Sequence, residues 1–113
     1  MSRRNQPSNG QRIVAGLLVL TQFFWLPPSL AATYYWDADA NPTNNVLPST
    51  GLGGTGTWNA TTANWWDGSS VTSTIWANSS ANVAAFAGTG GVVTLGAAIT
   101  AGGLTFDSDG YTI

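Results

Sequence analysis

The chain has 113 residues and carries only three basic and five acidic side chains, with a formal net charge of −2. It contains no Cys, His, Lys or Glu, which excludes disulfides, the usual zinc, haem and iron–sulfur ligand sets, and Ser-His-Asp or Cys-His catalysis within the chain. Three arginines are too few for the basic surface that nucleic-acid binding requires. The length allows one small domain at most.

The segment 1–31 has the organisation of a secretory signal peptide. A positive n-region is followed by the segment 13–26, an uncharged and mostly apolar stretch. This stretch is shorter than the roughly 20 residues that a membrane-spanning helix needs. The order of positive, apolar and small residues predicts an exported chain with a signal-peptide helix at its start. The basic residues are Arg3, Arg4 and Arg12.

The predicted cleavage site lies at Ala31 and Ala32. Pro27-Pro28 ends any helix, because proline has no backbone N–H to donate, and the small residues Ser29 and Ala31 follow. Signal peptidase accepts small side chains at the last and third-last positions of the segment that it removes, so cutting after Ala31 fits best. The mature chain then keeps five aspartates and no cation, which gives a charge of −5.

The segment 82–113 repeats a short apolar–Thr–apolar pattern. In a strand, the apolar residues of each copy face one way and the threonine faces the other. Short strands at near-even spacing predict an all-β fold that begins a β-solenoid. The alternative is a small β-sandwich with the segment 107–110 as an ordinary hairpin loop. The copies are Val93-Thr94-Leu95, a weaker Ile99-Thr100-Ala101, Leu104-Thr105-Phe106 and Tyr111-Thr112-Ile113.

The segment 32–81 is rich in Trp, Gly and Asn and poor in aliphatic side chains. Terminal turns of a solenoid need covering, so we expect the tryptophans to form an N-terminal cap. The alternative is a row of exposed indoles that stacks on sugar rings, as in a carbohydrate-binding module. The residues concerned are Trp58, Trp65, Trp66 and Trp76.

Most of the segment 34–113 resembles the autotransporter-associated β-strand repeat and the region that precedes it in very long exported bacterial proteins. The repeat-like strings are Ala84-Ala85-Phe86, Val93-Thr94-Leu95-Gly96, Ile99-Thr100-Ala101-Gly102-Gly103-Leu104-Thr105-Phe106 and Gly110-Tyr111-Thr112-Ile113. The preceding strings are Trp36-Asp37, Gly53-Gly54-Thr55-Gly56, Gly56-Thr57-Trp58-Asn59 and Asn64-Trp65-Trp66-Asp67. The resemblance implies a right-handed parallel β-helix passenger, displayed on or released from the cell surface. The chain departs from the family in holding about one repeat and no outer-membrane barrel.

Two polar motifs do not predict a site. Asp37-x-Asp39-x-Asn41 matches the first three ligand positions of an EF-hand loop, but Pro42 and Pro48 occupy the places of the required Gly and Glu. We therefore expect a solvated loop and no metal or other cofactor, with a looser calcium site as the alternative. Asp37/Asp39 and Asp107/Asp109 are the carboxylate pairs, and nothing apolar around them in the sequence predicts the separated pKa values of a glycosidase. We expect no catalytic residue and no enzyme.

The sequence thus predicts three segments: a signal peptide over 1–31, a cap over 32–81, and a first, truncated repeat over 82–113. The expected function is non-catalytic: the structural N-terminal part of an exported bacterial surface passenger that contributes to adhesion. The expected partners are downstream repeats of a longer chain, the secretion machinery and signal peptidase, together with glycans or cell surfaces. The alternatives are a small secreted carbohydrate-binding β-domain and a passenger whose catalytic residues lie downstream.

Overall fold

The computed structural model describes residues 31–113, and the predicted leader over 1–30 lies outside the described residues. The described chain is built from strands, with no α-helix in this range, which confirms the all-β prediction. The strands are β1 (Ala32–Trp36), β2 (Gly56–Trp58), β3 (Trp65–Trp66), β4 (Asn82–Phe86), β5 (Val93–Leu95) and β6 (Gly103–Phe106), and a 3-10 helix η2 (Pro42–Asn44) follows β1.

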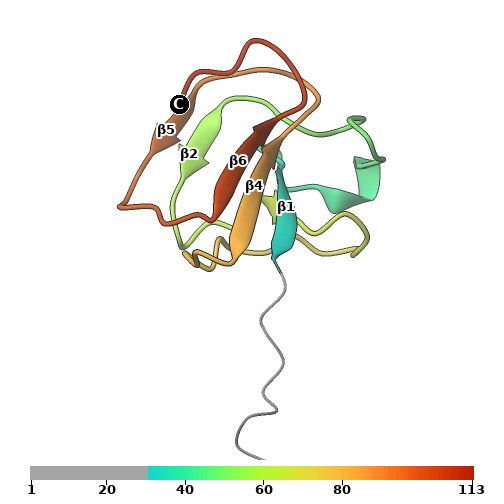
Figure 1. Ribbon diagram of the computed structural model, residues 1–113. Coiled ribbons are helices and arrows are strands. Elements are labelled where there is room, and N and C mark those ends of the chain that lie inside the picture. Colours follow the sequence, from blue (N-terminus) through green and yellow to red (C-terminus); the bar gives the residue numbers. More distant parts are fainter. Residues whose placement is uncertain (1–30) are drawn as a thin grey trace, which may run out of the picture.

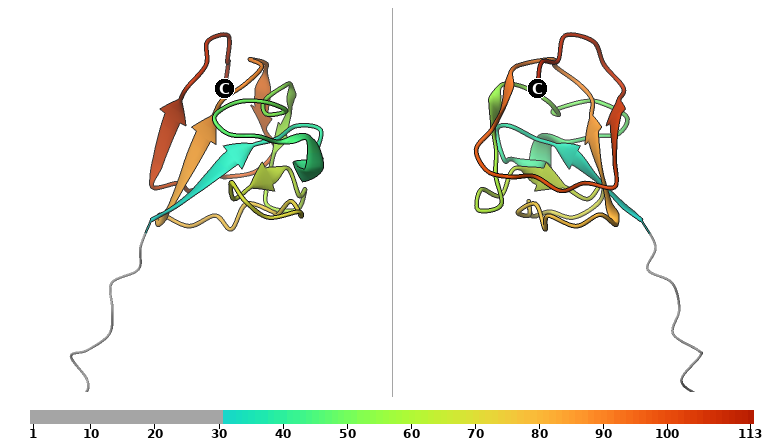
Figure 2. Two further views of the ribbon diagram at one scale, coloured as in Figure 1. Left: turned by 90° about the vertical axis from the view of Figure 1, so that its right-hand side faces the viewer. Right: turned by 60° about the vertical axis from the view of Figure 1, so that its left-hand side comes forward.

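The strands form two sheets that lie on opposite sides of the core (Figure 1). The larger sheet has the order β3-β1-β4-β6, and the smaller sheet pairs β2 with β5. Strands β1, β4 and β6 are mutually parallel, as are β2 and β5, whereas β3 runs antiparallel to β1. Figure 2 shows β1, β4 and β6 side by side as one twisted sheet.

The chain alternates between the two sheets as it advances. It passes from β1 to β2, later from β4 to β5, and then from β6 to Thr112, which pairs in parallel with Val92. In the larger sheet Val83 of the second pass pairs with Gly103 of the third, as Val92 pairs with Thr112 in the smaller sheet. The two paired residues are the same number of positions apart in the sequence in both sheets. The connection over 107–110 therefore joins two sheets and is not the hairpin loop of the sandwich alternative.

The parallel register of the larger sheet places aromatic side chains of successive strands next to one another. Rings of Trp36 and Phe86 lie 6.3 Å apart, and those of Phe86 and Phe106 lie 5.1 Å apart. On the opposite face, Tyr35 pairs with Ala85, which pairs with Thr105. The two-residue period of the strands thus places one ladder of aromatic side chains in the main core and a second ladder on the other face, where Tyr35 packs against the smaller cluster, Ala85 is buried and Thr105 is exposed.

The core lies between the sheets and draws on both predicted segments. Its main cluster is dominated by aromatic side chains, and a smaller cluster of Leu52, Trp66 and Ala87 packs beside Tyr35. Because the clusters join side chains from 32–81 and 82–113, these segments fold as one unit. The main cluster contains Trp36, Trp58, Trp65, Trp76, Ala84, Phe86 and Val93.

Candidate functional site

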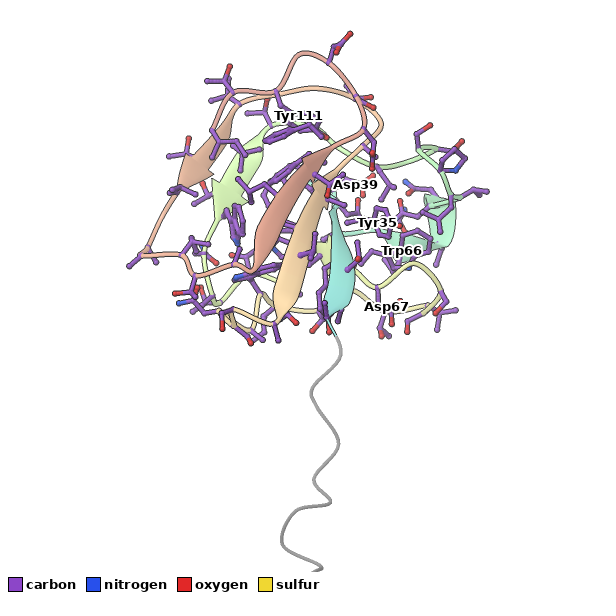
Figure 3. All side chains as sticks on the ribbon, viewed as in Figure 1. Tyr35, Asp39, Trp66, Asp67 and Tyr111 are labelled. Atoms are coloured by element: carbon purple, nitrogen blue, oxygen red, sulfur yellow. The ribbon has the colours of Figure 1, made fainter. Side chains whose placement is uncertain are left out.

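The four tryptophans that the sequence analysis singled out are all buried. Trp65 lies at the centre, with ring centroids 4.8 Å from Trp58 and 4.7 Å from Trp76. Trp66, the next residue, points to the smaller cluster and packs on Tyr35 at 6.1 Å (Figure 3). Tilted and edge-on aromatic pairs at such separations add to the stabilisation from burial. This arrangement favours the cap over sugar stacking, because a stacking platform needs an exposed ring face.

Indole hydrogen bonds join parts of the chain that are far apart in the sequence. Trp36 Nε1 donates to the carbonyl of Gly54 at 2.8 Å, and Trp76 Nε1 donates to the carbonyl of Thr100 at 2.9 Å. The second bond links the predicted cap to the predicted repeat. Trp58 Nε1 and Trp65 Nε1 have no acceptor within the described part of the chain. The cluster therefore relies on packing more than on hydrogen bonding.

The antiparallel strand β3 covers one edge of the larger sheet. Trp65 exchanges two backbone hydrogen bonds with Thr74, at 3.1 Å and 2.8 Å, and Tyr35 of β1 pairs with Trp66. The backbone of β1 is thus paired on both sides, by β3 and by β4. At this edge of the larger sheet, β3 therefore shields β1, and Trp65 of β3 packs in the main aromatic cluster.

The opposite end of the molecule exposes apolar side chains. Leu104, Phe106 and Ile113 of the last pass, together with Leu95 at the end of β5, are about half exposed although they continue the interior ladders, and we call these four residues the open end. Leu95, Leu104 and Ile113 line a hollow of about 280 Å³ whose floor includes buried Trp58. Strand β6 is also the edge strand of its sheet in the described structure. An exposed apolar edge strand favours pairing with further chain.

Asp37 does not lie in a solvated loop, and that prediction is wrong for this residue. Its side chain is 0% exposed, whereas Asp39 and Asn41 are exposed as expected. The chain folds back over Asp37, because Gly53 bonds to Trp36 and Ala38 on either side of it. Burial raises the pKa of Asp37 to about 6, and the neighbouring Asp39 adds to the shift. The pKa of Asp39 is lowered, chiefly by the hydrogen bond that the Asn44 side chain donates to it.

Tyr111 is partly buried and packs against the main cluster, a role that its apolar–Thr–apolar pattern did not distinguish from that of its neighbours. Its hydroxyl donates to the carbonyl of Ala87 at 2.7 Å, and its ring lies 5.3 Å from that of Phe86. Burial raises its pKa to about 12. The nearby Asp107 and Asp109 are both exposed, without an apolar enclosure around their carboxyl groups.

The predicted cleavage site falls at the start of the folded region. Ala31 is exposed, and Ala32 begins β1 and donates its backbone N–H to the carbonyl of Ala81 at 3.2 Å. Over 31–113 there is no helix long and apolar enough to cross a membrane. The same part of the chain contains no group of three or more Asp, Glu, His or Cys that would suit a metal ion.

Comparison with known proteins finds similarity to an autotransporter adhesin. Over 86 residues it is 38% identical to the adhesin BmaC autotransporter of Brucella suis biovar 1 (strain 1330). This chain is related to an autotransporter adhesin. The match covers 74% of the chain but 2% of the length of the adhesin. No protein-family model matches the chain, and no solved structure matches it significantly, so membership of the β-strand repeat family stays a prediction.

Proposed function

We propose that this chain is the N-terminal part of an exported, β-helical passenger of the autotransporter type, with a structural role and no catalysis. The observation that carries the proposal is the open end: an interior ladder that continues to half-exposed Leu104 and Phe106 on an edge strand. The similarity to a small fraction of a much longer adhesin supports the same interpretation.

The solenoid part of the proposal rests on the parallel pairing. Three successive passes contribute to the larger sheet through β1, β4 and β6, and the last two are offset by the same sequence distance in both sheets. A sandwich of hairpins pairs sequential strands antiparallel, whereas a coil that returns to the same sheet pairs them in parallel. Parallel crossovers are right-handed in nearly all proteins. We infer a right-handed β-helix whose later coils repeat this offset.

The cap part of the proposal rests on the asymmetry between the two ends. Strand β3 pairs with β1 of the first pass, and Trp65 and Trp76 pack on Trp58 at the end of that pass. Nothing in the described chain covers Leu104 and Phe106 of the last pass in the same way. Since repeat proteins need polar or closed ends for solubility, the covered end acts as the terminal cap and the open end receives the next coil.

We propose the location of the chain and its part in adhesion from its similarity to the adhesin and from the predicted signal peptide. The chain passes through the secretion machinery, signal peptidase cuts after Ala31, and the remainder is held at the cell surface or outer membrane, or released. Adhesion belongs to the whole passenger, and this segment contributes by starting the coil. Mass spectrometry of the exported chain tests the first step, with Ala32 expected as the new N-terminus.

The main experiment extends the chain through its downstream coding sequence by two further coils. We expect lower binding of a fluorescent apolar dye, because Leu104 and Phe106 become covered. Burying the rest of each side chain adds about 1 kcal/mol, so thermal stability rises. A scrambled extension of equal composition is the control. A stop codon directly after Ile113, or equal behaviour of the native and scrambled extensions, contradicts the proposal.

A further inference from the structure

Asp37 is a buried carboxyl group without a cationic partner. The described segment 31–113 contains no Arg, Lys or His, so none of its side chains can neutralise this group. Asn45 Nδ2 donates to Asp37 Oδ2 at 2.8 Å, while the other oxygen, Oδ1, is buried with no donor among the described residues. An ionised carboxylate in such a place needs a compensating positive charge or must take up a proton.

A second carboxyl group lies against the first. Asp39 lies near enough to Asp37 to raise the pKa of the Asp37 carboxyl group, after the larger effect of burial. Asp39 is held in place by the backbone N–H of Asn41, which donates to Oδ1 at 2.9 Å, and by Asn44 Nδ2, which donates to Oδ2 at 2.9 Å. Two neighbouring carboxylates repel each other unless a proton or a cation lies between them.

Asn45 supplies an independent observation at the same place. Its side chain is 8% exposed and its amide is directed at Asp37, yet its Oδ1 is buried and accepts no hydrogen bond from any described residue. Rotating the amide by half a turn exchanges Nδ2 and Oδ1. The group therefore offers a donor to the carboxylate in one orientation and a ligand oxygen to a cation in the other.

We propose that Asp37, Asp39 and Asn45 form a binding site for a hard divalent cation, calcium, at the C-terminal end of β1. Calcium takes carboxylate, amide, carbonyl and water oxygens in flexible numbers, which suits two carboxylates and one amide. Sulfur and imidazole ligands, which transition metals prefer, are not offered by Cys or His anywhere in the described segment. Asp39 also borders a hollow of about 450 Å³ lined mainly by the segment 51–55, with room for water ligands.

This site goes beyond the proposed function, because it makes the stability of the cap depend on calcium. The ligands lie on either side of η2, and Gly53, where the chain returns, bridges in parallel to both Asp37 and Thr89. Binding calcium there stabilises the covered end only where calcium is plentiful. If the chain is exported as proposed, that place is outside the cell, so the cap gains stability after export.

Terbium luminescence tests the site directly, because Tb³⁺ replaces calcium and is excited through nearby indoles, here Trp36 next to Asp37. With the full chain we expect saturable emission that calcium displaces and equal concentrations of magnesium do not. Asp39→Asn removes an exposed ligand and should weaken Tb³⁺ binding at least about tenfold, since calcium affinity follows ligand charge. Asp67→Asn, an exposed aspartate in another turn, is the matched control.

Thermal unfolding distinguishes a bound calcium ion from a proton held by the two carboxyl groups. At pH 7.5 calcium should raise the unfolding temperature of the chain and of Asp67→Asn, but not that of Asp37→Asn or Asp39→Asn. If calcium has no effect on the unmodified chain, or if Asp39→Asn retains full Tb³⁺ emission, the carboxyl pair holds a proton and the proposal is overturned. Neither result bears on the coil extension that tests the proposed function.

Discussion

Phe86 and Phe106 stack with ring centroids 5.1 Å apart and an interplanar angle of 15°, although they belong to successive passes of the chain. They occupy paired positions of the parallel strands β4 and β6. Phe86 is fully buried and Phe106 is about half exposed. The contact therefore marks where the covered core of the molecule passes into the open end.

Truncating the two rings should have unequal effects. Phe86→Ala leaves a cavity in the main cluster, and we expect a loss of about 3–5 kcal/mol in the free energy of unfolding. Phe106→Ala removes a ring that water already reaches, and we expect about half that loss. Urea unfolding followed by tryptophan fluorescence measures both. Equal losses would mean that Phe106 is as well covered as Phe86, which contradicts the open end.

Two neighbouring glycines provide a matched test of the close packing between passes. Gly53 and Gly54 both have positive φ, +96° and +100°, so alanine at either position carries left-handed strain of about 1–3 kcal/mol. A Cβ at Gly53 also meets the backbone carbonyl of Thr89 and its nitrogen at 2.6 Å, whereas one at Gly54 meets only Ala38 Cβ at 3.1 Å. Gly53→Ala should destabilise the chain clearly more than Gly54→Ala in chemical unfolding. The reverse order would contradict the described contact.

The stability of the chain should depend on pH through Asp37 when divalent cations are removed by a chelator. Burial raises its pKa from 3.8 to about 6, so between these values the folded chain binds more protons than the unfolded chain. Stability should therefore be highest near pH 4 and fall as the pH rises through 6, by up to about 3 kcal/mol. Thermal unfolding from pH 4 to 8 measures this.

Substitution shows which group is responsible for that pH dependence. Asp37→Asn should remove the decrease between pH 4 and 7. Asp67→Asn should leave it, because the pKa of Asp67 is lowered, first by the hydrogen bond from Ser70, and its stabilisation is lost only as the pH falls below about 4. A decrease that persists in Asp37→Asn would assign the titration elsewhere.

Tryptophan emission should be blue-shifted and unchanged by sugars. Trp58, Trp65 and Trp76 are buried and pack on one another, so their rings lie in an apolar environment without a free face. Titration with a panel of oligosaccharides should give no saturable change in emission. A saturable change that Trp58→Phe abolishes would support the carbohydrate-binding alternative in place of the cap.

The local strand pattern could be predicted from the sequence because it depends on neighbouring residues. The alternation Val93-Thr94 places valine inside and threonine outside, as the two-residue period requires. The all-β class follows from the same pattern and from the scarcity of helix formers. Which strands pair, and in which direction, depends on residues far apart in the chain, such as Val83 with Gly103 and Ala32 with Asn82.

The candidate sites also divide into features that local sequence predicts and features that depend on distant parts of the chain. Composition alone established that no histidine, cysteine or lysine chemistry is available and that the three arginines lie between positions 3 and 12. The sequence pattern placed Asp37 in a solvated loop and left the tryptophans open to two interpretations. That Asp37 and the indoles are buried follows from the folded chain and not from their neighbours in sequence, because distant segments such as Gly53 and Phe86 fold over them.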